Sequence, residues 1–138
     1  MNAPGYNPMR WKCEALGCFN VVARPKVELF ADCFPGKCSL GDIDYEEELN
    51  GFHLRMEWKQ FATQIPPGQR IAFDSLISIP NLKFTVLCVA GDAHRMTVTH
   101  AMHYTGRNSV WIARDFGWVR TFLARWALWA MKQERWAA

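Results

Sequence analysis

The chain has 138 residues, half of them hydrophobic, and a formal net charge of +3. This length is typical of one domain with a substantial core, so we expect a single domain over residues 1–138. The start MNAPGYNPMR lacks an apolar signal region, and no apolar run reaches the length of a membrane span. These features argue against secretion and membrane insertion and predict a cytoplasmic protein. The small positive charge is compatible with a nucleic-acid partner but does not indicate one by itself.

The first part of the chain is rich in turn residues and cysteine. Residues 1–10 contain Pro, Gly and Asn and are expected to form a flexible tail. Residues 11–40 carry four of the five cysteines. They form two pairs with equal gaps: Cys13 with Cys18, and Cys33 with Cys38. Four thiolates could hold one structural Zn²⁺ ion, and these gaps lie at the wide end of zinc-site spacing. Four buried thiols are the alternative, and the sequence leaves both interpretations open.

The next segment, Gly41 to Lys59, is predicted to form a β-hairpin. Asn50-Gly51 is a strong signal for a two-residue type I′ turn, which fixes the register of the two strands. Leu49 then faces Phe52, and the pairs continue outward: Glu48 with His53, Glu47 with Leu54, Glu46 with Arg55, Tyr45 with Met56, Asp44 with Glu57, Ile43 with Trp58, and Asp42 with Lys59. One face is mostly apolar and the other is polar, as expected of a half-buried antiparallel pair.

The remainder of the chain predicts an α/β fold. A helix is expected over Gln69–Ile79 after the Pro-Pro-Gly loop, and the continuous apolar run 84–90 reads as a strand buried on both faces. A strand, a helix and a buried strand in this order suggest a βαβ crossover with parallel strands. Residues 95–104 alternate as a further strand, and a brief strand is expected within SVWIA. A helix beginning at Asp115 or Gly117 and reaching Trp136 completes a mixed sheet of about four or five strands.

The polar face of the hairpin carries the most chemical information. Asp44 and Glu57 face each other, and two opposed carboxylates are destabilising unless something compensates their charge. A divalent cation is the simplest compensation, and Mg²⁺ takes one or two carboxylates together with water and phosphate oxygens. The backbone carbonyl of Trp58 could add an oxygen ligand. Lys59 projects from the same face and could neutralise phosphate charge or act on an attacking water. Asp42 is either a second ligand or a partner for Lys59.

Asp44, a hairpin, and then Glu57-Trp58-Lys59 resemble the signature of the PD-(D/E)xK nuclease superfamily. Gln69, early in the following helix, resembles the Gln found there in VRR-type and Holliday-junction-resolvase-like branches, and small phage-type nucleases are the most similar in character. The resemblance covers about residues 33–92. Gly41 departs from the pattern, since the family usually has Pro at this position before Asp42.

The resemblance implies a restriction-endonuclease-like core and a metal-dependent endonuclease acting on DNA, with Mg²⁺ or Mn²⁺ as cofactor. It assigns Asp44, Glu57, Lys59 and Gln69 to catalysis, and it implies a bacterial or phage-infected cell. A homodimer would let two symmetry-related sites reach two strands. The alternative is an inactive nuclease-like fold that binds nucleic acid or protein.

Overall fold

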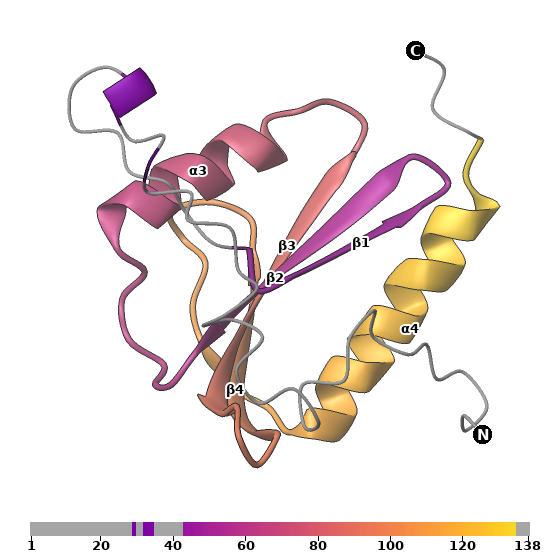
Figure 1. Cartoon of the computed structure of the whole chain (residues 1–138). Coiled ribbons are helices and arrows are strands. Elements are labelled where there is room, and N and C mark those ends of the chain that lie inside the picture. The colour runs from indigo at the N-terminus through magenta and orange to yellow at the C-terminus, as the bar shows by residue number, and fades with distance from the viewer. Residues whose placement is uncertain (1–28, 30–31, 35–42, 135–138) are drawn as a thin grey trace. The chain divides into compact units, whose positions relative to one another are not determined.

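The computed structural model describes residues 29, 32–34 and 43–134. The chain divides between Gly41 and Asp42 into two units, and the fold described here belongs to the second. Its elements are β1 (Tyr45–Leu49), β2 (Phe52–Lys59), α3 (Pro67–Ile77), β3 (Phe84–Asp92), β4 (Thr97–Tyr104), β5 (Ile112–Ala113) and α4 (Phe116–Lys132). The strands form one five-stranded sheet in the order β1-β2-β3-β4-β5. Helix α3 lies on one side of this sheet and α4 on the other (Figure 1), which confirms the predicted α/β class.

The hairpin has the register that its turn predicts. Asn50 and Gly51 both have positive φ, 56° and 86°, as a type I′ turn requires. The predicted pairs from Leu49–Phe52 to Tyr45–Met56 are all present. The first strand is shorter than expected, because β1 begins at Tyr45 and Asp44 forms a bend before it. The predicted pairs of Asp44 and Ile43 therefore lie beyond the ladder.

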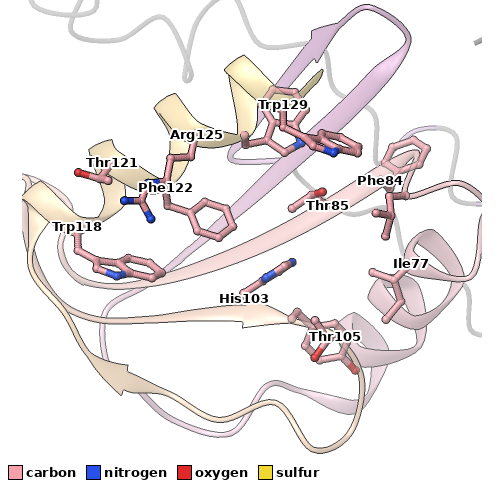
Figure 2. A pocket seen from close by; sticks show the side chains of 13 residues that line it. Ile77, Phe84, Thr85, His103, Thr105, Trp118, Thr121, Phe122, Arg125 and Trp129 are labelled. Atoms are coloured by element: carbon pink, nitrogen blue, oxygen red, sulfur yellow. The ribbon is translucent and has the colours of Figure 1, made fainter. Parts of the chain in front are cut away.

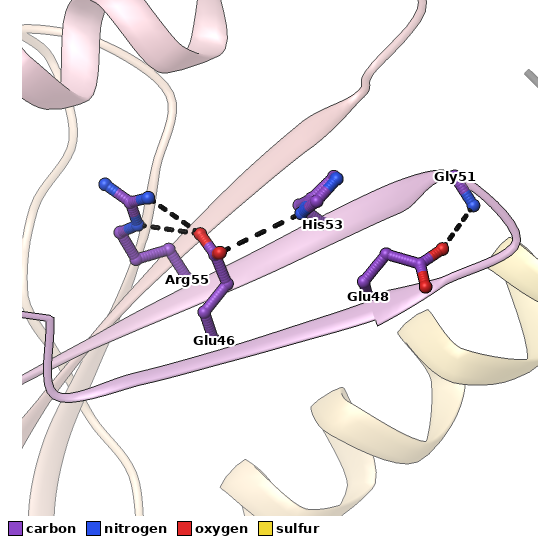
Figure 3. Close-up of polar contacts among 5 residues, drawn as sticks. All are labelled: Glu46, Glu48, Gly51, His53 and Arg55. Carbon is purple, nitrogen blue, oxygen red and sulfur yellow. Dashed lines mark hydrogen bonds and ion pairs between the residues drawn. The ribbon is translucent and has the colours of Figure 1, made fainter.

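The polar face of the hairpin carries a cross-strand ion pair and neighbouring polar contacts. Arg55 Nε and Nη2 donate to Glu46 Oε1 at 3.0 and 2.7 Å, and Glu46 Oε2 lies 3.9 Å from His53 Nδ1 (Figure 3). Glu48 does not reach His53 but accepts a hydrogen bond from the Gly51 amide at 2.6 Å. The Gly51 contact stabilises the turn, and the Glu46–Arg55 contact is an ordinary cross-strand ion pair.

The centre of the sheet is the predicted βαβ crossover. Strands β2 and β3 run parallel and are joined by α3, while β3 and β4 run antiparallel. Helix α3 begins at Pro67, two residues earlier than expected, because proline is well suited to a first helical position. Residues 86–90 of β3 are buried, since helices cover both faces of this strand.

Two side-chain layers fill the space between the sheet and its helices. On the α3 side, Phe73 packs with Val86, Cys88, Met102 and Tyr104. On the α4 side, two clusters join strand residues to the helix; their buried members are Phe52, Leu54, Trp126 and Ala130, and Leu87, Val89, Ala101 and Val119. Alternation along each strand therefore assigns successive residues to opposite layers.

Helix α4 begins directly after Asp115, one of the two predicted starting residues. Asp115 is its N-cap, and Asp115 Oδ1 accepts a hydrogen bond from the Trp118 amide at 2.9 Å. The helix ends at Lys132 rather than at Trp136. There the Asn50 side chain donates to the carbonyls of Ala130 and Gln133, at 3.0 and 2.6 Å. Among the described residues, no helix is both long and apolar enough to cross a membrane.

Candidate active site

Three of the predicted catalytic side chains meet where β2 ends and α3 begins. Glu57 and Lys59 are two residues apart in β2, so both side chains project toward the α3 side of the sheet. Glu57 Oε1 accepts a hydrogen bond from Gln69 Nε2 at 2.8 Å and lies 3.4 Å from Lys59 Nζ. The Glu57 side chain is only 12% exposed and that of Lys59 23%, so the ion pair is partly shielded from water.

Asp44 reaches this region through the backbone of β2. Its Oδ2 atom accepts a hydrogen bond from the Trp58 amide at 2.8 Å. The amide and carbonyl of one strand residue point to the same side, so the Trp58 carbonyl is also directed to the β1 edge. The Asp44 carboxylate thus accepts the hydrogen bond that a backbone carbonyl would accept from Trp58 if β1 extended this far. The register placed Asp44 beside Glu57, but it did not predict this contact with the backbone.

Cys88 lies beside Glu57 on strand β3 and belongs to the buried layer on the α3 side of the sheet, here called the floor. It is the β3 residue in register with Glu57, and it packs with Phe73 on the α3 side. The pKa of the Cys88 thiol is raised to about 12, chiefly by burial and also by the Glu57 carboxylate, while the Lys59 ammonium acts in the opposite direction. The thiol is fully buried, which agrees with its predicted place in the core. The carboxylate therefore rests on a neutral surface of low polarity.

The Gln69 amide uses one of its two polar atoms within the described part of the chain. Gln69 Oε1 is buried and has no hydrogen-bond partner among the described residues. A buried acceptor without a partner is unfavourable by about 1–3 kcal/mol. The amide nitrogen is already engaged by Glu57. The oxygen is therefore available to a donor such as a water molecule at the site.

Some predicted site residues lie outside the described part of the chain. These are Asp42, the proposed further metal ligand, and three of the four proposed zinc ligands, Cys13, Cys18 and Cys38. Cys33 is described and is exposed. Within the described residues, no group of three or more His, Cys, Asp and Glu side chains is placed to hold a metal. The two-carboxylate site and the zinc site both stay predictions.

A separate cavity of about 600 Å³ lies between α4 and the strands β3 and β4. Figure 2 shows Phe122 and His103 facing each other in it, with ring centroids 5.3 Å apart, and Arg125 also lines the cavity. Burial lowers the pKa of His103. Sequence reasoning missed this cavity, because helical spacing identifies the aromatic residues of α4 only as core candidates. Most of the residues that line it lie on the opposite face of the sheet from Glu57.

Comparisons of the chain with protein-family models, with curated proteins and with solved structures find no match.

Proposed function

We propose that this protein is a metal-dependent endonuclease of the PD-(D/E)xK type, with a restriction-endonuclease-like core, that hydrolyses DNA phosphodiester bonds. The observation that carries the proposal is the contact of Glu57 with both Lys59 and Gln69 at one corner of the sheet. These three residues are called the corner below. A surface ion pair would need only the lysine. The additional glutamine, which has an oxygen left without a partner, is better explained by a reaction site.

The donor set at this corner suits a hard divalent cation. Both described contacts of Glu57 use Oε1, and the Asp44 contact uses Oδ2, so each carboxylate has a second oxygen for a metal ion. The Trp58 carbonyl is directed to the same strand edge as the Asp44 carboxylate. Two carboxylates and a carbonyl, completed by water and phosphate oxygens, form a suitable environment for Mg²⁺ or Mn²⁺. When bound, the ion would supply Lewis-acid stabilisation of the phosphate charge.

The side chains would divide the remaining work. Hydrolysis joins a water oxygen to phosphorus while the bond from phosphorus to the leaving sugar oxygen breaks; the attacking water gives up a proton to solvent, and the leaving oxygen takes one from solvent. Gln69 Oε1 would accept a hydrogen bond from that water and fix its position. Lys59, held by Glu57 at 3.4 Å, would place its ammonium group against the phosphate oxygens, where negative charge increases in the transition state. The buried floor around Cys88 strengthens both interactions by excluding water.

The test is DNA cleavage by the wild-type protein and by variants of the corner. Supercoiled, linear, single-stranded and branched DNA are incubated with Mg²⁺, Mn²⁺ or EDTA. We expect metal-dependent cutting, and we expect Glu57→Gln and Lys59→Ala to reduce the rate by at least about a hundredfold. Glu47→Gln is the matched control, because Glu47 is an exposed carboxylate of the same hairpin that lies outside the corner.

Two results would contradict the enzyme proposal. One is cutting that persists in both corner variants, which would identify a contaminating nuclease. The other is the absence of cutting on every DNA form with either metal, while circular dichroism shows the protein folded. DNA binding without cutting would then favour the inactive binding module.

A further inference from the structure

A second, smaller cavity lies on the same face of the sheet as Glu57. Its volume is about 230 Å³, and it is formed by the approach to α3, the end of β4 and the turn that follows β4. The register places it relative to the proposed site, since Glu57 pairs with Cys88, and Cys88 pairs with Met102, which lines the cavity. Neighbouring strands lie about 4.8 Å apart, so Met102 is about 10 Å from Glu57 across the sheet.

Two aromatic residues of this cavity are held in place by hydrogen bonds. Trp111 Nε1 donates to the Thr63 carbonyl at 2.8 Å, and the Tyr104 hydroxyl donates to Asp74 Oδ1 at 2.7 Å. Tyr104 is also packed against Phe73, with ring centroids 5.4 Å apart. Together with Met102, these side chains make an apolar lining whose geometry is fixed before any ligand arrives. Such a lining suits a flat ring system.

The polar lining of the cavity consists of cations and neutral hydrogen-bonding groups. Arg70, Arg107, Gln64 and Ser109 line it. Arg70 follows Gln69 directly, and its Nε atom is buried without a hydrogen-bond partner among the described residues. Guanidinium groups in proteins normally use their donors on carboxylates, phosphates or carbonyl oxygens. Arg70 lines the cavity, so its guanidinium group is placed to donate to the acceptor atoms of a ligand there.

We propose that this cavity binds the unpaired base of a nucleotide close to the scissile phosphate, so that the substrate is single-stranded DNA or DNA with an unpaired nucleotide at the cut. The inference rests on the proposed nuclease function and specifies its substrate. A base that is stacked and paired in a duplex cannot enter such a pocket without leaving the helix. Aromatic stacking of the base, with the acceptor atoms of its edge facing Arg70 and Arg107, matches the lining.

The experiment combines a change in the DNA with a change in the cavity. A fluorescently labelled single strand is cut with Mn²⁺, the cut is mapped, and each nucleotide around it is replaced in turn by an abasic one. For the wild-type protein we expect one position near the cut at which loss of the base slows cleavage about tenfold. Arg70→Met should slow cleavage of the intact strand by a similar factor and should not slow cleavage of that abasic strand further.

If Arg70 had only a structural role, Arg70→Met would slow cleavage of the intact and the abasic strand by the same factor. A base pocket predicts instead that Arg70→Met slows cleavage of the intact strand only. Arg107→Met offers the same test at an exposed side chain, in case Arg70→Met does not fold. Arg120→Met is the matched control, because Arg120 is exposed on α4 and lines neither cavity. Additive losses in both cavity variants would overturn the proposal, as would equal cleavage of a single strand and of the fully paired duplex.

A binding measurement in EDTA separates this inference from the proposed function. Fluorescence anisotropy compares the single strand, the abasic strand and the duplex on wild-type protein and Arg70→Met. The base pocket would be supported, even if no DNA were cut, if the wild-type protein bound the abasic strand more weakly than the intact strand and Arg70→Met bound the two equally. Equal affinity for all three DNAs would reject the pocket, and the proposed nuclease function would stand if the DNA were still cut.

Discussion

Gly91 shows how one residue without a side chain supports the candidate site. It lies at a register shift between β3 and β4 and has φ of 154°. A Cβ atom added there would lie 1.9 Å from the Thr97 carbonyl oxygen, closer than any van der Waals contact. The Gly91 carbonyl accepts a hydrogen bond from Trp58 Nε1 at 2.9 Å. Gly91 thus helps to hold Trp58, the residue between Glu57 and Lys59, in place.

We therefore predict that Gly91→Ala lowers the free energy of unfolding by roughly 3 kcal/mol, because the backbone must move to remove the clash. Urea denaturation followed by circular dichroism measures this change. Gly68→Ala is the control, since Gly68 lies in the first turn of α3 with nothing within 4 Å of an added Cβ. It should change stability by no more than about 1 kcal/mol, and in the stabilising direction. Equal effects of the two substitutions would contradict the argument.

Cys88 gives a second prediction at the level of one residue. Its thiol is fully buried, and its pKa of about 12 leaves almost no reactive thiolate at neutral pH. In the native protein at pH 8, with EDTA present to remove any bound metal, iodoacetamide should modify the exposed Cys33 and leave Cys88 unmodified. Peptide mapping by mass spectrometry reads the two sites separately. In denaturant Cys88 should react fully; its modification in the native protein at the rate of Cys33 would contradict its burial.

At the scale of elements, the hairpin turn also caps the last helix. Asn50 has the positive φ that the turn needs, and its side-chain amide donates to two carbonyls at the end of α4. Asparagine is favoured in such turns for its conformation alone, so the sequence explained the residue without the second role. The Asn50 contacts connect residues 80 and 83 positions apart in the chain.

Asn50→Gly separates the two roles, because glycine adopts the turn conformation readily but has no amide side chain. We expect the substitution to lower the free energy of unfolding by about 1–2 kcal/mol, as two carbonyls lose a partner. Asn81→Gly is the control: Asn81 also has positive φ, 66°, and is exposed. Its replacement should change stability by less than about 0.5 kcal/mol. Thermal or urea unfolding of both variants provides the comparison.

The element boundaries show which local signals were decisive. The strong turn at Asn50-Gly51 fixed five strand pairs, because a two-residue loop allows one register. Proline at a first helical position and Asp115 as an N-cap determined where α3 and α4 begin. The ends were less predictable. Strand β1 begins only at Tyr45, where the Asp44 side chain takes the Trp58 amide as its partner. Helix α4 ends at Lys132, where the Asn50 side chain binds the carbonyl of Gln133.

At the scale of the whole molecule, a metal ion held by Asp44 and Glu57 would link the bend before β1 to the end of β2. A ligand that binds only the folded protein at a hundred times its dissociation constant stabilises it by about 2.7 kcal/mol. We therefore predict that Mn²⁺ raises the melting temperature of the wild-type protein without any DNA present. Glu57→Gln should abolish the increase, and Glu47→Gln should retain it. An equal increase in all three proteins would indicate binding elsewhere.

The sequence by itself determined the α/β class, the hairpin register, the parallel crossover and the identity of the polar side chains at the corner. These features depend on local turn chemistry and on hydrophobic periodicity, which neighbouring residues specify. Only the tertiary structure decided that Gln69 contacts Glu57, that Asp44 binds the Trp58 amide, and that Arg70 lines a cavity beside the site. These features depend on where a helix comes to rest on a sheet, which is set by the packing of residues distant in the chain.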